Sequence, residues 1–278
     1  MGPARFNSSV DQKVRFYLTL REEIPKRLSI IISSAVFLLL FGLWGFLSYN
    51  GWISEVFLPA PTSVLWASVQ LFKERVLLQD VWISNFRILA GFLLAVIVSI
   101  PLGILSGNVR VFEAVLDPLV GFVRYMPVPA FIPLVMLYVG IGETAKVLVI
   151  FIGTVVQMVI QIADATKQVS ANLLKVAFTL GAKPDEIFTK VIWRASLPNI
   201  FDILRVNLGW AWTYLLVAEL VAANQGLGFR ILKAQRFLKT DIIFLYIFLI
   251  GLLGIAFDLL FKALHKKFFP WAQEKLKA

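Results

Sequence analysis

The sequence predicts an all-α protein of the membrane with about six spanning helices. Of its 278 residues 59% are hydrophobic and only 16% are charged, whereas a soluble domain has about half apolar and roughly a quarter charged residues. Several stretches also reach, or nearly reach, the roughly 20 apolar residues that a helix needs to cross a bilayer. These predicted spans are residues 29–49, 87–107, 116–139, 146–162, 204–223 and 242–264.

The six stretches differ in how regular a helix they predict. The first contains no charged residue, and Pro101 and Gly103 interrupt the second. The third carries Arg124 and then three prolines, beginning with Pro127. A broken helix is tolerated at membrane depth only where protein or water satisfies its backbone. We therefore interpret the third span as broken. The fourth predicted span is short, and the fifth and sixth follow it.

The positive charges predict the orientation. The net charge is +10, and Lys and Arg are enriched in the cytoplasmic loops of membrane proteins. They concentrate in the N-terminal tail (1–28), in the connection between spans four and five (164–199) and in the C-terminal tail (265–278). We therefore expect both tails and this connection to be cytoplasmic, with residues 29–264 forming the membrane domain.

The connection 164–199 has a helical pattern of its own. Its first apolar stripe is followed by Gly181, a residue that readily ends a helix in the left-handed conformation. Pro184 and Asp185 suit the first turn of a second helix, which we expect Pro198 to close. Two short helices around a glycine would form an apolar protruding surface that fits a groove of a partner protein. The alternative is an amphipathic helical hairpin that lies on the lipid surface.

Residues 175–181, followed by Leu197-Pro198, resemble the EAA loop of bacterial ABC importer permeases. In that family the loop forms the coupling helix that docks into the ATP-binding subunit. Lys175 stands where the family has Glu, which affects any contact that needs this carboxylate but not the helix–glycine–helix shape. The resemblance implies a set of coupling residues. They are Ala177, Gly181, Ala182, Pro184, Asp185, Phe188, Leu197 and Pro198.

Further segments, in order and spacing, are similar to the nitrate/sulfonate/taurine permeases. They include residues 57–61, 124–127, 140–143, 218–220 and 226–228. This resemblance implies a homodimer in the bacterial inner membrane, working with ATP-binding subunits that hold ATP and Mg and with a periplasmic or lipid-anchored binding protein. It implies import of a small anion, such as an aliphatic sulfonate or taurine. Nitrate, bicarbonate and an organic nitrogen compound are alternatives.

Two other classes of function are possible, an integral-membrane enzyme and a stand-alone channel or secondary carrier. The chain has no phosphate-binding G-x-x-x-x-G-K-[ST] motif, no cysteine and a single histidine, His265. We therefore expect no catalytic site, bound metal or cofactor in this chain. The two-helix loop disfavours a carrier, which needs no dock for an ATPase. We expect lipid as a partner and no nucleic acid.

Candidate residues of the translocation path are polar groups within the spans, where charge is costly. Arg124 and Glu219 are the charged candidates, and they could instead be a structural ion pair or hydrogen-bond anchors. Glutamines on the fourth span are neutral donors one turn apart, equally suited to packing between helices. The candidates are Arg124, Pro127, Gln157, Gln161, Trp212 and Glu219.

One loop conflicts with the predicted orientation. Arg230, Lys233, Arg236 and Lys239 recur every three residues between spans five and six, on the expected outer side. They either contact lipid head groups or acidic residues of a binding protein, or form a positive funnel that attracts anions.

Overall fold

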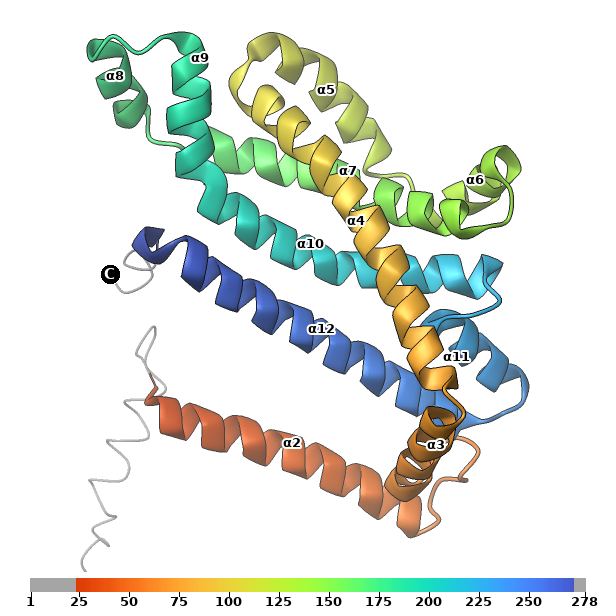
Figure 1. Cartoon of the computed structure of the whole chain (residues 1–278). Coiled ribbons are helices and arrows are strands. Elements are labelled where there is room, and N and C mark those ends of the chain that lie inside the picture. Colours follow the sequence, from red (N-terminus) through yellow and green to blue (C-terminus); the bar gives the residue numbers. More distant parts are fainter. Residues whose placement is uncertain (1–23, 273–278) are drawn as a thin grey trace, which may run out of the picture. The chain divides into compact units, whose positions relative to one another are not determined.

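The computed structural model describes residues 24–272, and the regular secondary structure of this part is entirely helical (Figure 1). The chain divides into two compact units, here residues 24–62 and 63–272. Most of the predicted N-terminal tail and the last six residues of the predicted C-terminal tail lie outside the described residues. The helical prediction is confirmed for the described part.

The first unit consists of helix α2 (Lys26–Tyr49) and the segment that follows it. The indole N–H of Trp44 donates to the Pro59 carbonyl (3.0 Å), and the Ser48 hydroxyl donates to the Leu58 carbonyl (3.2 Å). These bonds hold the segment after the helix against its last two turns. Apolar side chains along the rest of α2, such as Leu38, are exposed.

The second unit contains the remaining helices. Their bounds are α3 Pro61–Lys73, α4 Val76–Asn108, α5 Arg110–Val123, η1 Val128–Phe131, α6 Ile132–Val139, α7 Glu143–Lys167, α8 Ala171–Thr179, α9 Pro184–Glu186, η2 Ile187–Ile192, α10 Trp193–Ala222, α11 Leu227–Arg236 and α12 Thr240–Phe268.

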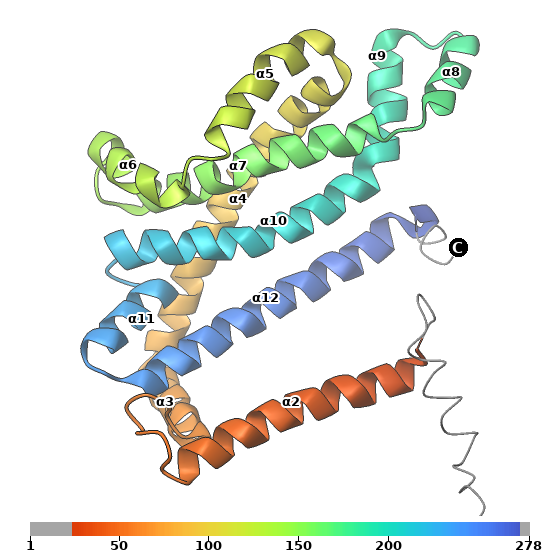
Figure 2. The same ribbon diagram turned by 180° about the vertical axis from the view of Figure 1, so that it is seen from behind.

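Three long helices of this unit, α7, α10 and α12, lie side by side and run alternately in opposite directions (Figures 1 and 2). Helix α4 packs along α7 in the same direction. Helices α4 and α7 pack closely because Gly91 and Gly103 of α4 face Ile150 and Ile162 of α7. A Cβ atom on either glycine would lie 2.7 Å from the isoleucine side chain, so only glycine permits this approach.

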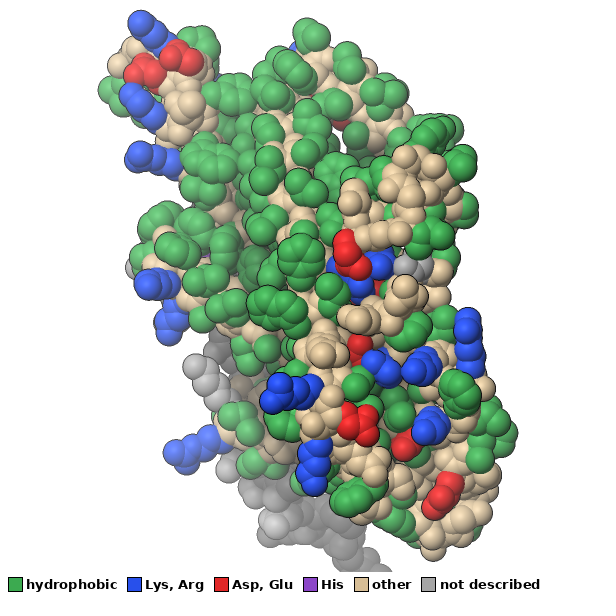
Figure 3. Space-filling view, turned by 45° about the vertical axis from the view of Figure 1, so that its right-hand side comes forward, with side chains coloured by type: hydrophobic (Ala, Val, Ile, Leu, Met, Phe, Trp, Pro, Cys, Tyr) green, Lys and Arg blue, Asp and Glu red, His purple; other side chains and the backbone are tan. Residues whose placement is uncertain are grey.

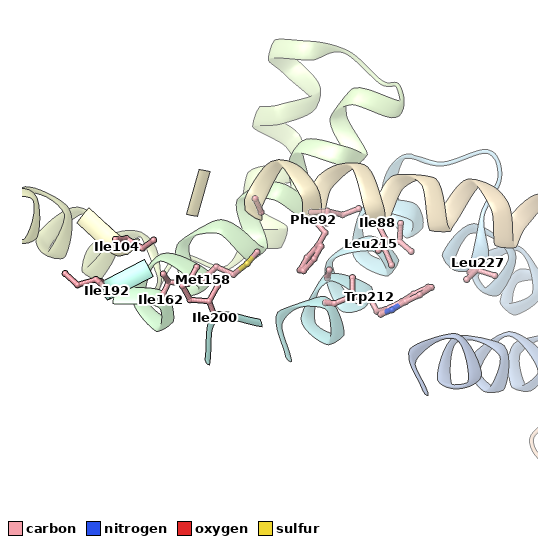
Figure 4. Packing of buried hydrophobic residues seen from close by; sticks show 14 of the residues in the cluster. Ile88, Phe92, Ile104, Met158, Ile162, Ile192, Ile200, Trp212, Leu215 and Leu227 are labelled. Atoms are coloured by element: carbon pink, nitrogen blue, oxygen red, sulfur yellow. The ribbon is translucent and has the colours of Figure 1, made fainter. Parts of the chain in front are cut away.

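The apolar core lies where these helices meet (Figure 4). Phe92 of α4, Met158 of α7 and Leu215 of α10 are buried there, and Leu227 extends the core to α11. A second, smaller core joins α6 to the first half of α7 through residues such as Ile132 and Val149. Burial of these side chains fixes the helices on which the polar residues described below are placed.

Large apolar side chains also cover much of the surface, as Figure 3 shows for one face. Ile97 of α4 is 68% exposed and Leu252 of α12 is 64% exposed. Contiguous exposed apolar surface indicates contact with lipid or with other protein. Four helices, α2, α4, α7 and α12, are long and apolar enough to cross a membrane, or five spans if α5 and the η1–α6 segment form one.

The predicted spans need correction at α4 and α10, whereas the predicted break in the third is confirmed. Helix α4 begins at Val76, not at residue 87, because its charged residues Asp80 and Arg87 are buried among partners. The third stretch is two helical segments bent by 90° at the break after Val123. Helix α10 has 30 residues, but it is not among the helices that are apolar enough to cross a membrane, because it carries charged and amide side chains. Six spans stay a prediction.

The predicted end of the loop helix at Leu197-Pro198 is wrong. From Pro184 the chain stays helical through a π-helical turn, η2, into α10, and Pro198 lies inside α10. A proline inside a helix removes one backbone hydrogen bond, and its ring crowds the carbonyl four residues earlier. Here the buried neighbours Ser196 and Ile200 hold the helix on both sides of it.

Candidate functional site

A cavity of about 270 Å³ lies where the third predicted span breaks. Arg124, Tyr125 and Pro127 of the break form one wall, and Gln157 of α7 and Tyr214 of α10 contribute to the others. The structure thus brings three of the predicted path residues, Arg124, Pro127 and Gln157, to one cavity. We call it the Arg124 pocket.

A second cavity of about 250 Å³ shares Arg124 with the first. It lies between α5 and α7, and its lining includes Asp117, Asp164 and Lys167. The Lys167 ammonium also donates to the Glu113 carboxylate (2.6 Å). We call it the carboxylate pocket, because two acidic side chains line it.

The other predicted path residues lie elsewhere. Gln161 accepts a hydrogen bond from the Asn207 side chain of α10 and lines a third cavity of about 350 Å³. Trp212 is buried against Phe257 of α12 (centroids 6.1 Å apart), and its indole N–H has no hydrogen-bond partner in the described part of the chain. Glu219 is fully buried in the last turn of α10.

Glu219 pairs with Arg87 and not with Arg124. The Arg87 guanidinium donates to Glu219 (2.7 Å), to the Gln225 carbonyl (2.7 Å) and through two nitrogens to Glu143 at the start of α7. Glu219 also accepts from the Ser84 hydroxyl (2.6 Å) and from a backbone N–H in α11 (2.8 Å). This buried network joins α4, α7, α10 and α11, so the alternative of an Arg124–Glu219 pair is wrong.

A second buried carboxylate, Asp80 of α4, holds α11 and α12. It accepts from Arg230 (2.8 Å), from the Tyr246 hydroxyl (2.8 Å) and from the Gly226 backbone N–H (2.9 Å). Gly226 has φ +121°, and a Cβ there would lie 2.5 Å from Glu219. Glycine is therefore required at this turn, both for its backbone conformation and for space.

Arg87 and Asp80 are the important residues that sequence reasoning missed. Their signal was present, since charges beside or within an apolar helix are expected to pair internally. The predicted span starts at Arg87 and excludes Asp80, whereas α4 begins at Val76 and contains both residues. No sequence pattern showed that Glu219, more than 130 positions away, supplies the partner.

The basic cluster between α10 and α12 is also smaller than predicted. Arg230 is bound to Asp80, with only 17% of its side chain exposed. The pKa of Arg230 is raised, because hydrogen bonding to Asp80 and the Asp80 charge outweigh the lowering effect of burial. Lys233 and Arg236 are exposed on α11, and Lys239 follows the helix.

The proposed coupling segment has the helix–glycine–helix shape. Helix α8 ends before Gly181, whose φ is +81°, and α9 begins at Pro184. Glu186 accepts from the Lys190 ammonium (2.8 Å) and from the Lys183 backbone N–H (3.1 Å), and both bonds lower its pKa. Ala177, Ala182, Phe188 and Leu197 are half-buried, whereas Gly181, Pro184 and Asp185 are exposed.

Within the described residues, no three His, Cys, Asp or Glu side chains are grouped so that they could hold a metal ion.

Residues 99–270 match the family described as the binding-protein-dependent transport system inner membrane component. The chain belongs to this family. The permease is 37% identical over 232 residues to a Brucella abortus protein named "Probable ABC transporter permease protein", covering 84% of the permease and 92% of that protein. It is 32% identical over 255 residues to the taurine transport system permease protein of Escherichia coli K12, covering 90% and 93%.

Other relatives of the permease are named for the transport of aliphatic sulfonates and of bicarbonate. A solved structure of the MetNI methionine ABC transporter in an inward-facing conformation has a chain of similar fold. The TM-score is 0.58 at 20% identity, over 68% of the permease and 95% of that chain. The permease thus has the fold of an ABC transporter membrane subunit.

Proposed function

We propose that the permease forms the translocation path of an ATP-driven importer for a small anion, with an aliphatic sulfonate or taurine as the first choice. Two observations support this. The relatives include a taurine transport permease, and the Arg124 pocket has a guanidinium as its only charged lining group. Nitrate or bicarbonate is the alternative cargo, because the same pocket chemistry suits other compact oxyanions, and an organic nitrogen compound is a further alternative.

The partners follow from the family and the surface. We propose that α8, Gly181 and α9 dock into an ATP-binding subunit that holds ATP and Mg. A second copy of the permease covers exposed apolar surface, and a binding protein delivers the cargo at the outer side. In this arrangement both termini and the 164–199 connection are cytoplasmic, in the bacterial inner membrane.

The test is uptake by the complete system. The gene is deleted in its host, and growth on taurine or ethanesulfonate as sole sulfur source is compared with growth on sulfate. Affinity purification of the tagged permease should recover an ATPase subunit, and vesicles containing the complex should take up radiolabelled taurine only with ATP and the binding protein. Unimpaired growth and uptake in the deletion strain would refute the proposal for these cargoes.

A further inference from the structure

The Arg124 pocket has the chemistry of a binding site. We propose that it binds the oxyanion group of the cargo, with Arg124 as its main ligand, so that the permease itself holds the solute during passage. This inference rests on the proposed function. It goes further than that function, because a permease could form a path without any binding site of its own and leave selection of the cargo to the binding protein.

The first argument is the distribution of charge. Arg124 is the only charged side chain of the Arg124 pocket, and no carboxylate of the described residues forms an ion pair with it. In the carboxylate pocket the same guanidinium lies together with Asp117, Asp164 and Lys167, two acidic groups and one further cation. The attraction for an anion is therefore strongest on the side of the Arg124 pocket, where no carboxylate lines the cavity.

The second argument is the orientation of the guanidinium. One Arg124 nitrogen donates to the Tyr125 hydroxyl (2.6 Å), and the guanidinium carbon lies 4.6 Å from the Tyr125 ring centroid. The Tyr125 bond uses one of the five N–H donors of arginine. Remaining donors suit a bidentate contact with a sulfonate or similar oxyanion, and Gln157 adds a neutral amide on the same pocket.

The third argument is size. The volume of about 270 Å³ is just below the roughly 300–1,000 Å³ typical of pockets for drug-sized ligands. Gly153 lines the pocket, and the Tyr214 ring packs against it. A Cβ at Gly153 would lie 2.5 Å from that ring, so the absence of a side chain lets Tyr214 line the pocket. Both features suit a compact ion.

Because the chain has no cysteine, a single introduced thiol reports occupancy. We would make Val156→Cys, on the lining beside Gln157, in the full complex in membrane vesicles. The rate of alkylation by a small maleimide is measured with rising ethanesulfonate, taurine or ethylammonium, at constant ionic strength. We expect the two sulfonates to slow alkylation and ethylammonium, which lacks the oxyanion, to have no effect.

Adding Arg124→Gln should raise the sulfonate concentration needed for half-protection by about tenfold to hundredfold, the usual loss for a charge-assisted hydrogen bond. Arg124→Lys should keep part of the protection. Arg110→Gln is the matched control, because Arg110 is exposed at the start of α5, the helix that Arg124 follows, but lines neither pocket. Asn172→Cys, on exposed α8, checks that the sulfonates do not slow maleimide chemistry itself.

The outcomes separate the site from the proposed function. If the unaltered complex imports sulfonates but shows no protection, or if protection survives Arg124→Gln, the site is refuted and the function stands. If sulfonates protect but uptake is absent, the site stands and the function fails. Occupation of Arg124 by a lipid phosphate would leave alkylation insensitive to every added solute, which also refutes the proposal.

Discussion

Replacement of Arg87 by methionine should destabilise the permease more than almost any other single charge removal. The Arg87 side chain is 2% exposed and its partner Glu219 is 0% exposed. Removing the guanidinium deletes four hydrogen bonds and leaves the Glu219 carboxylate buried beside Ser84 without a cation. Breaking a buried pair in this way costs about 3–5 kcal/mol of unfolding free energy.

Loss of the bond from Arg87 to Glu143, the second carboxylate of the network, adds little to this free-energy cost. Glu143 is 47% exposed and keeps its bond from Lys146 (2.8 Å), so solvent and the ammonium still compensate its charge. The cost should therefore come mainly from Glu219. Glu219→Gln in the Arg87→Met background should recover part of the loss, with a coupling energy of about 1–3 kcal/mol.

The assay is reversible unfolding in mixed micelles by titration with dodecyl sulfate, followed by tryptophan fluorescence. Lys262→Met is the matched control, because its pair with Asp258 (2.6 Å) is exposed, at 55% and 43% of the two side chains. Exposed pairs contribute about 0–1 kcal/mol. If Arg87→Met proves too unstable to purify, Arg87→Lys should show an intermediate loss, since lysine lacks the bidentate geometry. An Arg87→Met protein as stable as the Lys262→Met protein would refute the reasoning.

Three further predictions concern coupling, orientation and charge. Gly181→Val should leave membrane insertion intact but reduce ATPase assembly or substrate-stimulated hydrolysis, because a β-branched residue resists φ +81°; normal uptake would falsify the docking role. Lys183→Cys should react only with a thiol reagent added on the cytoplasmic side, and Ile141→Cys only with one added on the outside. Labelling of both positions from the same side would contradict the orientation. Neutralising Lys233 and Arg236 should lower uptake most at low salt. A parallel fall in binding-protein affinity would instead assign both residues to docking, and no change would leave them as lipid anchors.

Local patterns were sufficient for α2, α7 and α12 and for the position of the main break. The apolar stretches predicted α2, α7 and α12 to within a few residues, since a long apolar run leaves a membrane chain no other way to satisfy its backbone. Arg124 and the prolines after it predicted a break, and the helix there does bend by 90°. Gly181 likewise predicted where α8 ends.

Patterns failed where distant side chains decide the outcome. Pro198 was taken as a helix end, but burial of its neighbours keeps α10 continuous. Arg230 was grouped with exposed basic residues, but Asp80 holds it in the fold. In both cases the competing interaction comes from packing that the local sequence does not encode.

The sequence by itself determined the all-α class of this protein, three of its long helices and, through the resemblance of its loop and span motifs, its family. The tertiary structure decided which polar groups meet. Glu219 is neutralised by Arg87, and Arg124 is left facing a pocket with Gln157. The physical reason is that an apolar stretch lies within one continuous segment of the sequence, whereas the pairing of buried charges depends on how α4, α7, α10 and α11 pack together.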